Sequence, residues 1–262
     1  MKHALTNQGL YDEYRSEEIR KIIAAVNKYG ISISGKAILD MGCNDGAITS
    51  NYIELGASEA IGVDIDDCAI RFAQEHRTLK NLTFRSSTTT SLPVADDLID
   101  LIISYDVFEH VSQPDRMLDE CWRVLKPGGK VLIGTWGWHH PFAPHLWSTL
   151  PVPWAHIFFS EKTMLRTCQR VYESPWYVPN MHDLDETGEK LQNRYSNESI
   201  SEDYLNKLLI KDFEELFEES RFAFSVYPEP FGSKYAGWTK VFLNTPWIRE
   251  FITSYIWVVL TK

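Results

Sequence analysis

The first half of the chain alternates short apolar runs with segments of helical periodicity. The apolar runs cover 37–42, 60–64, 98–104 and 130–135, the last entered through a turn at 126–129. Apolar residues three and four positions apart indicate amphipathic helices at 17–28, 68–75 and 117–124. Ser16 precedes the first of these helices and is its predicted N-cap. Short buried strands that alternate with helices predict a parallel sheet with helices on both faces.

The pattern changes after residue 135, where eight of the nine tryptophans lie. Residues 139–154 are rich in proline, histidine and aromatic side chains and have no clear period. Flexible linkers lack so much aromatic surface, so this segment is predicted to be an ordered loop or lid. Beyond it the pattern predicts helices at 160–172 and 204–219, strands at 222–227 and 254–260, and a polar excursion at 183–203. The simplest account is one doubly wound domain with a long insertion.

Composition and charge narrow the function classes. The 262 residues are 44% hydrophobic and 24% charged, which is ordinary for a globular protein and excludes a collagen, a coiled coil or a disordered chain. The formal net charge is -10 and lysine and arginine form no run, so no nucleic-acid partner is expected. The four cysteines show neither a CxxC pair nor a zinc spacing, which predicts reduced thiols. With no signal-peptide pattern and no transmembrane segment, a cytoplasmic protein is predicted.

A glycine-rich turn follows the first predicted strand and opens a helix. Its glycines, Gly42 and Gly46, let the backbone approach a ligand closely, and the helix start adds free N–H donors. Asp64 ends the next strand, so both features are expected at the carboxyl ends of neighbouring parallel strands, where ligands bind. A carboxylate there can accept both ribose hydroxyls, which predicts a nucleoside cofactor. The glycine spacing is not GxGxxG, and Asp40 and Asp45 disfavour a pyrophosphate, so a nicotinamide dehydrogenase fits less well.

Five features of the chain follow one another in the order that one family shows. They are the glycine turn at 40–46, the strand-end acid Asp64, and the segments 92–100, 104–111 and 123–129. On these motifs the chain resembles class I S-adenosylmethionine-dependent methyltransferases of the small-molecule type, similar to the O-methyltransferases of ubiquinone biosynthesis. The resemblance is good over 36–136 and loose over 204–262, and the insertion between them lies outside it.

The resemblance implies an α/β fold. Its Rossmann-like, doubly wound sheet has seven mostly parallel strands with helices on both faces, one antiparallel strand near the C-terminus and an inserted lid. A single methyltransferase domain, 1–262, would then comprise an N-terminal helical cap at 1–35, a cofactor-binding core at 36–136, a lid or substrate insertion at 137–207, and a C-terminal helix and strands at 208–262.

The resemblance also implies S-adenosylmethionine as cofactor and S-adenosylhomocysteine as product. Cofactor contacts are expected from Asp40, Gly42, Cys43, Gly46, Asp64, Ile65, Thr88 and Tyr105. Asp64 would hold the ribose, Tyr105 would cover the methionine arm, and Cys43 would offer its backbone rather than a nucleophile. Thr88 is a departure, because the family has an aspartate there that holds the adenine amino group.

Histidines follow the last core strand, where the acceptor of the methyl group is expected. Methyl transfer from a sulfonium depends mainly on holding donor and acceptor in line, and a hydroxyl acceptor also needs a base. His139 and His140 are the predicted catalytic candidates for that base, and structural histidines in an aromatic lid are the alternative. A metal ion held by His139, His140 and His145 is a further alternative, but HHxxxxH is not a known ligand spacing and no metal site is predicted.

Aromatic and histidine residues also suggest where the acceptor binds. The predicted substrate-binding residues are Tyr11, Tyr14, His110, His145 and Trp147. The aromatic segment 136–159 is either a substrate cap, which we favour, or an exposed surface for a partner or a membrane interface.

The predicted function is methyl transfer to a small-molecule acceptor, most simply the hydroxyl of a sugar, a phenol or a natural product. Nitrogen is the second choice of acceptor atom, and a non-catalytic, S-adenosylmethionine-binding regulatory subunit is an alternative of another class. A homodimer through the apolar strand 254–260 is a further expectation if that strand lies at a sheet edge; it could equally be central.

Overall fold

A computed structural model describes residues 7–180, 183–184, 189–196, 204–231, 241–243 and 245–262, with the backbone alone at 7–14. The strands are β1 Ala37–Met41, β2 Glu59–Asp64, β3 Leu82–Ser86, β4 Ile99–Tyr105, β5 Leu125–Thr135, β6 Ala223–Pro230 and β7 Thr253–Thr261. The helices are α1 Asn7–Lys28, α2 Ala47–Glu54, α3 Asp67–His76, α4 Pro114–Val124, α5 Ala155–Phe158, α6 Glu161–Glu173, α7 Ile210–Glu219 and α8 Pro246–Ile252. Two short 3-10 turns, η1 Phe108–His110 and η3 Arg194–Ser196, complete the described elements used below.

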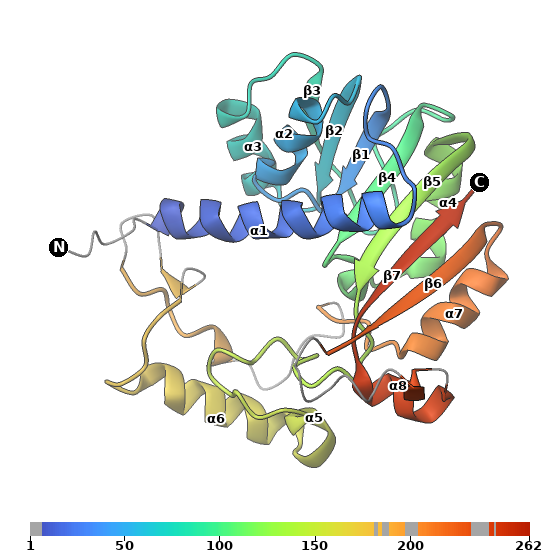
Figure 1. Cartoon of the computed structure of the whole chain (residues 1–262). Helices are drawn as coiled ribbons and strands as arrows, with labels where there is room; N and C mark the ends of the chain where they lie inside the picture. The colour runs from blue at the N-terminus through green and yellow to red at the C-terminus, as the bar shows by residue number, and fades with distance from the viewer. Residues whose placement is uncertain (1–6, 181–182, 185–188, 197–203, 232–240, 244) are drawn as a thin grey trace.

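The strands form one seven-stranded sheet in the order β3-β2-β1-β4-β5-β7-β6 (Figure 1). The strand β7 runs antiparallel to both of its neighbours, β5 and β6, and the pairs among β1 to β5 are parallel. The predicted sheet with one antiparallel strand near the C-terminus is therefore confirmed. Because β7 is paired on both sides, the alternative that placed 254–260 at a sheet edge is wrong, and dimerisation through that strand has no support.

Alternate side chains of the strands enter two different cores, as the period-two geometry of a strand requires. Leu39 of β1 packs with residues of α4 and α7, whereas Ile38 packs with residues of α1, α2 and α3. Both faces of the sheet are therefore covered by helices. The lid segment, 137–207, has a small core of its own, which contains Leu146, Met164 and Cys168. Figure 1 shows α5 and α6 of the lid standing apart from the sheet, beyond its carboxyl-terminal edge.

Three predicted boundaries are wrong. Helix α1 begins at Asn7, so Ser16 lies inside the helix and is not its N-cap; the described residues of α1 that enter the core begin at Ile19. The predicted turn at 126–129 belongs to β5, because Gly128 donates a hydrogen bond to the carbonyl of Lys262 and Gly129 accepts one from Lys262. Helix α7 begins at Ile210 rather than at 204. The carboxylate of Glu250 accepts the N–H groups of Ile210 and Lys211, at 2.9 and 3.0 Å, which satisfies the start of α7.

Other elements depart from the sequence analysis by omission. Strand β3 and helix α8 were not predicted, since each is short and carries little periodicity, whereas the helix expected after the glycine turn is confirmed as α2. The helix predicted at 160–172 is confirmed as α6, whose N-cap Ser160 accepts a hydrogen bond from the N–H of Thr163. The predicted polar excursion at 183–203 falls partly outside the described residues. Within the described part of the chain, no helix is both long enough and apolar enough to cross a bilayer.

Candidate functional site

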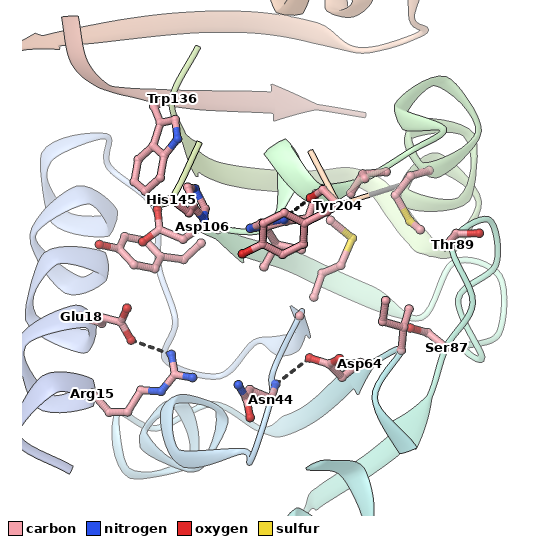
Figure 2. A pocket seen from close by; sticks show the side chains of 18 of the residues that line it. Arg15, Glu18, Asn44, Asp64, Ser87, Thr89, Asp106, Trp136, His145 and Tyr204 are labelled. Carbon is pink, nitrogen blue, oxygen red and sulfur yellow. Dashed lines mark hydrogen bonds and ion pairs between the residues drawn. The ribbon is translucent and has the colours of Figure 1, made fainter. Parts of the chain in front are cut away.

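A cavity of about 770 Å³ lies at the carboxyl ends of β1, β2 and β4, between α1 and the lid segment (Figure 2). One wall comes from the core strands and includes Gly42, Asp64, Ile65, Thr88 and Tyr105, and the opposite end includes His110, His140, His145 and Trp147. Nine residues predicted from sequence therefore line one cavity. Asp40, Cys43, Gly46 and His139 are not among the lining residues. Tyr11 and Tyr14 lie in α1, but their side chains are outside the described residues.

The turn after β1 brings the backbone of two strands together. Gly42 has φ +80°, and a Cβ atom there would lie 2.2 Å from Cγ2 of Val107, in the segment after β4. A side chain at Gly42 would therefore overlap Val107 and force the turn or the post-β4 segment to shift. The N–H groups of Gly42 and Cys43 both donate to the carbonyl of Val63 in β2, at 2.8 and 3.0 Å. Gly46 begins α2 with φ +75° against the ring of Phe84, so its part in the site is to shape the turn.

Asp64 is oriented by backbone amides on both of its oxygens. Oδ2 accepts the N–H of Asn44 at 2.8 Å, and Oδ1 accepts the N–H of Asp66 at 3.0 Å. A carboxylate has about four acceptor positions, so this one can still accept two hydroxyl donors from a ligand. Figure 2 shows Asp64 and Asn44 side by side on the cavity wall. The neighbouring Ile65 is 64% exposed, an apolar surface that a flat ring could cover.

Two predicted cofactor residues, Asp40 and Cys43, are buried and do not line the cavity. Asp40 is 5% exposed and accepts a hydrogen bond from Oγ1 of Thr49 at 2.5 Å. Burial raises the pKa of Asp40 to about 7, although the Thr49 hydrogen bond opposes that shift. The Cys43 thiol is also buried, and burial with the nearby Asp40 charge raises its pKa far above the usual range. Cys43 supplies its backbone N–H to the turn, and its buried thiol with a raised pKa lacks the environment of a reactive cysteine.

Helix α1 contributes a pair of opposite charges that the sequence analysis missed. Nη1 of Arg15 donates to Oε2 of Glu18 at 2.7 Å, and both residues line the cavity. Figure 2 shows this pair facing Asn44 across the cavity. The pair was missed because helix α1 was predicted to begin only at residue 17, which left Arg15 outside the helix. An i, i+3 charge pair was the signal available in the sequence.

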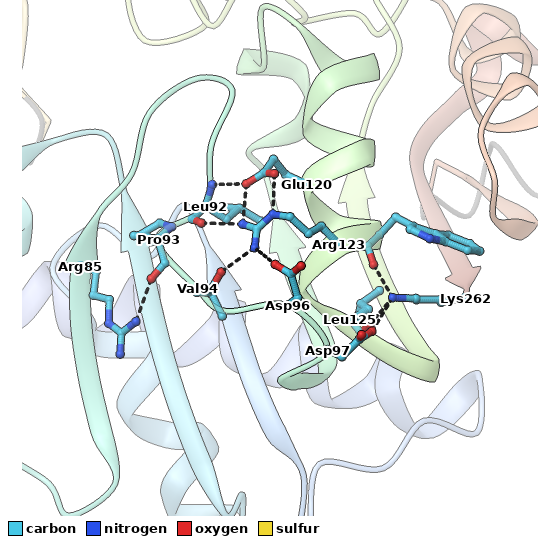
Figure 3. A network of polar contacts seen from close by, with 11 residues as sticks. Arg85, Leu92, Pro93, Val94, Asp96, Asp97, Glu120, Arg123, Leu125 and Lys262 are labelled. Atoms are coloured by element: carbon cyan, nitrogen blue, oxygen red, sulfur yellow. Dashed lines mark hydrogen bonds and ion pairs between the residues drawn. The ribbon is translucent and has the colours of Figure 1, made fainter.

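The segment that holds the edge of the cavity is fastened by one arginine (Figure 3). The guanidinium of Arg123 donates to the carbonyls of Leu92 and Val94, at 2.9 and 2.8 Å, and to Asp96 at 2.6 Å. It also donates to both carboxylate oxygens of Glu120, at 2.7 Å each, and Glu120 accepts the N–H of Leu92 at 2.8 Å. Leu92 lines the cavity, so this network sets the position of the wall.

Strand β4 ends in a strained acid at the middle of the cavity. Asp106 has φ +53°, and its Oδ1 accepts a hydrogen bond from the hydroxyl of Tyr255 at 2.6 Å. Burial, reinforced by the charge of Glu109, raises the pKa of Asp106 well above its usual range. The ring of Tyr105 lies 5.9 Å from that of Tyr255 and 5.8 Å from that of Trp257. The middle of the cavity thus combines a buried carboxyl with aromatic faces.

The two predicted catalytic histidines lie in different environments. His140 stacks on Trp136 with ring centroids 5.1 Å apart, and its Nδ1 accepts the N–H of Phe142 at 3.2 Å. Burial lowers the pKa of His140 to about 4, so the ring is neutral near pH 7 and carries its proton on Nε2. His139 stacks on Phe251 of α8, with centroids 4.5 Å apart, away from the cavity lining.

A different trio of polar side chains meets at the acceptor end. The potential ligand atoms of Glu109, His110 and His145 all lie within 4.8 Å of one another. From the sequence, the histidines considered for such a group were His139, His140 and His145. The difference arises because the carboxyl end of β4 brings Glu109 and His110 to the same place as the loop that carries His145, while His139 turns toward α8. Tyr204 completes this end of the cavity, and its ring lies 4.9 Å from that of His110.

Comparison with known proteins identifies the core of the chain. A protein family described as "Methyltransferase domain" matches residues 39–133. This segment is a methyltransferase domain. An uncharacterized methyltransferase of Mycobacteroides abscessus is 34% identical over 119 residues, which are 44% of this chain and 46% of that protein. A ubiquinone biosynthesis O-methyltransferase of Pseudomonas putida is 30% identical over 108 residues, 40% of this chain and 46% of that protein. The resemblance drawn from the motifs is thus confirmed for this domain.

The fold of the methyltransferase domain and its surroundings also has solved counterparts. An S-adenosylmethionine-dependent methyltransferase from Mesorhizobium loti superposes with a TM-score of 0.55 and 16% identity, covering 91% of this chain and 96% of that one. At this identity the likeness shows the fold. The matches to the two curated relatives span about half of their length. The cofactor expected of such a domain, S-adenosylmethionine, fits the residues present, because Asp64 keeps free acceptor positions and Ile65 offers an uncovered apolar surface beside it.

Proposed function

We propose that this protein transfers the methyl group of S-adenosylmethionine to an oxygen atom of a small-molecule acceptor. The observation that carries the proposal is the continuity of one cavity from Asp64, at the end of β2, to the histidines and aromatic rings beside the lid. A nucleoside donor at one end and an acceptor at the other would meet near Tyr105 and Asp106. The volume of about 770 Å³ is suited to two small molecules.

The donor end complements the parts of S-adenosylmethionine. The free acceptor positions of Asp64 suit the two ribose hydroxyls, and Ile65 suits one face of the adenine. Arg15 and Glu18 offer a cation and an anion, which complement the carboxylate and the ammonium of the methionine arm. The ring of Tyr105 lies between the two ends, where an aromatic face stabilises the sulfonium cation.

The reaction is a displacement in line with the carbon–sulfur bond. The acceptor oxygen forms a bond to the methyl carbon, and the carbon–sulfur bond breaks with its electron pair on sulfur, which leaves in neutral S-adenosylhomocysteine. The hydroxyl proton leaves to a base or to water. Holding the reacting atoms in line can supply roughly 7–11 kcal/mol, so positioning is the main task of the cavity walls.

His140 is poorly suited to remove the proton of the acceptor hydroxyl. Its Nδ1 lone pair already accepts the N–H of Phe142, so its Nε2–H can only donate a hydrogen bond to the acceptor. We therefore assign His140 to positioning the acceptor. The removal of the hydroxyl proton is assigned to the other polar groups at this end, Glu109, His110 and His145.

The donor half of the proposal is tested by calorimetry with S-adenosylmethionine. We expect micromolar binding by the purified protein and a loss of roughly 10- to 100-fold or more in Asp64→Asn, because charge-assisted hydrogen bonds to the ribose are lost. The control is Asp67→Asn, which removes an exposed acid three positions away that does not line the cavity. Equal binding by Asp64→Asn and the parent would contradict the assignment of Asp64.

The acceptor half is tested by incubation with panels of phenols, sugars and amines, with mass detection of methylated products. Methyl ethers are the expected products. Methylamines alone would move the acceptor atom to nitrogen. Tight binding of S-adenosylmethionine with no product from any panel would favour the regulatory-subunit alternative.

A further inference from the structure

We propose that Glu109, His110 and His145 bind a divalent metal ion such as Zn²⁺ at the acceptor end of the cavity. The three side chains come from two separate parts of the chain, the 3-10 turn η1 after β4 and the loop after β5. One carboxylate with two imidazoles is a ligand set that suits first-row divalent metals such as Zn²⁺ and Co²⁺.

The geometry places three ligand atoms around one point. Each residue offers one atom, and all three atoms lie within 4.8 Å of one another. Ligands at about 2.0–2.2 Å from a shared ion lie on the order of 3–4 Å apart, so side-chain movements of about 1 Å would close the trio on an ion. His110 and His145 line the cavity, which leaves the remaining coordination positions open toward a small molecule.

Two atoms of the trio that could serve as ligands are buried without a hydrogen-bond partner in the described part of the chain. Glu109 is 3% exposed, and its Oε1 has no such partner; the same is true of Nε2 of His145. Leaving a buried polar atom unsatisfied costs about 1–3 kcal/mol, and here two such atoms belong to residues whose possible ligand atoms lie close together. An ion between them would satisfy both atoms with the chemistry that each prefers.

The other carboxylate oxygen of Glu109 and the Nδ1 atom of His110 form hydrogen bonds with neighbouring groups. Oε2 of Glu109 accepts the hydroxyl of Thr135 at 2.7 Å, which directs Oε1 away from Thr135. Nδ1 of His110 lies 2.5 Å from the carbonyl of Tyr204, and since a carbonyl can only accept, Nδ1 carries the proton. The lone pair of His110 is therefore on Nε2, as a metal ligand requires. A histidine whose other N–H donates to a carbonyl is the usual supporting arrangement around a protein-bound metal.

The segment that contains Tyr204 is hydrogen-bonded to the turn η1, which carries Glu109 and His110. Nδ2 of Asn206 donates to the carbonyls of Phe108 and Val111, at 2.7 and 3.2 Å, and its N–H donates to the carbonyl of Glu109 at 2.8 Å. The residues 204–209, for which the sequence predicted a helix, are instead held against η1 by these bonds. Tyr204 is thereby kept over His110, so the orientation of His110 is built into the fold.

The role of the ion rests on the proposed function. A divalent cation in this position lowers the pKa of an oxygen ligand toward neutrality. The three side chains would then assist loss of the hydroxyl proton, which leaves to water, as ligands of the ion and not as free bases. The substrate class that follows is an acceptor with an ionisable hydroxyl. A neutral amine is already nucleophilic and would gain little from such an ion.

The experiment measures metal binding directly, with Co²⁺ and Zn²⁺ as the probes. The 262-residue chain is stripped with a chelator and titrated with Co²⁺, whose visible absorption reports coordination by nitrogen and oxygen ligands, and with Zn²⁺ by calorimetry. We expect one equivalent to bind, and affinity to fall at least 10-fold in Glu109→Gln and in His145→Asn. Glu109→Gln keeps the shape of the side chain and an acceptor for Thr135, so it is the variant least prone to unfold.

A matched control is His156→Asn. His156 also has a buried Nδ1 with no partner among the described residues, but it does not line the large cavity. Its loss should leave Co²⁺ affinity unchanged. Thermal unfolding and S-adenosylmethionine titration of each variant separate misfolding from loss of a ligand.

The outcomes distinguish the two proposals. S-adenosylmethionine binding with no stoichiometric Co²⁺ or Zn²⁺ binding would overturn the metal site and leave the methyl donor intact. Metal binding that Glu109→Gln and His145→Asn retain in full would also overturn it. Metal binding that these variants lose, in a protein that binds no S-adenosylmethionine, would support the site and contradict the proposed function.

Discussion

Arg15 donates a hydrogen bond to Glu18 at 2.7 Å, one helical turn away on the face of α1 that borders the cavity. The helix therefore presents a positive and a negative group to the same ligand site. Glu18 is 3% exposed, which is uncommon for a glutamate and is explained by this pairing. Across the cavity, the amides around Asp64 form a second polar wall, so the two walls contact different parts of one elongated molecule.

Arg15→Met is expected to weaken S-adenosylmethionine binding by about 10- to 100-fold, because it removes a charge-assisted contact to the methionine carboxylate. The comparison ligand is methylthioadenosine, which has the nucleoside and the sulfur but no amino-acid arm. Its affinity should be nearly the same in Arg15→Met as in the parent, whereas Asp64→Asn should weaken both ligands. Calorimetry with the two ligands measures this pattern. An equal loss for both ligands in Arg15→Met would remove the arginine from the methionine arm.

Gly42→Ala and Gly128→Ala form a matched pair. Both glycines have φ near +80°, but a Cβ at Gly128 meets nothing within 4 Å, while one at Gly42 would lie 2.2 Å from Val107. Gly128→Ala should cost only the left-handed conformation, about 1–2 kcal/mol of unfolding free energy. Gly42→Ala should cost a further 1–3 kcal/mol or so for the overlap. Urea unfolding of both variants tests the difference, and Val107→Ala should restore part of it only in the Gly42 variant.

Asp40→Asn should change the pH dependence of stability. The pKa of Asp40 is about 7 in the folded protein and close to 3.8 when unfolded, so the folded state holds the proton more tightly. As the pH rises between these values the unfolded chain ionises first, and this carboxyl lowers the unfolding free energy by up to about 4 kcal/mol. Asparagine has no such ionisation. The variant should therefore gain stability relative to the parent between pH 4 and pH 8, as measured by urea unfolding at several pH values; a constant difference would contradict the burial effect.

Arg123→Lys should destabilise the protein by about 1–3 kcal/mol, a range that allows for partial exposure of the guanidinium. A lysine ammonium cannot reproduce the fork that reaches two carbonyls and two carboxylates at once. Arg221→Lys is the control, because Arg221 and Asp119 are both more than 60% exposed and their ion pair contributes little. Thermal unfolding of the two variants should differ clearly. Equal melting temperatures would mean that the network around Leu92 is not needed for the fold.

The sequence by itself determined the features that depend on local conformation and on strand order. A glycine turn after a buried strand and an acid at the end of the next must meet, because parallel neighbours end at the same edge of the sheet. Gly42 and Asp64 were predicted on that basis, and Ile65, Thr88 and Tyr105 were expected from the family resemblance; all five line the cavity. The antiparallel place of β7 followed from the resemblance rather than from periodicity.

Which side chains meet at the acceptor end of the cavity depends on tertiary packing and could not be predicted from the sequence. Adjacent residues such as His139 and His140 cannot be told apart by spacing, because the orientation of a loop depends on what packs against it. In the structure, His139 stacks on Phe251 and His140 stacks on Trp136. The meeting of Glu109 and His110 with His145 depends on how the loop after β5 returns across the end of β4. The place of Arg15 depends on where α1 begins, which apolar periodicity does not mark, because Arg15 lines the cavity and the described core residues of α1 begin at Ile19.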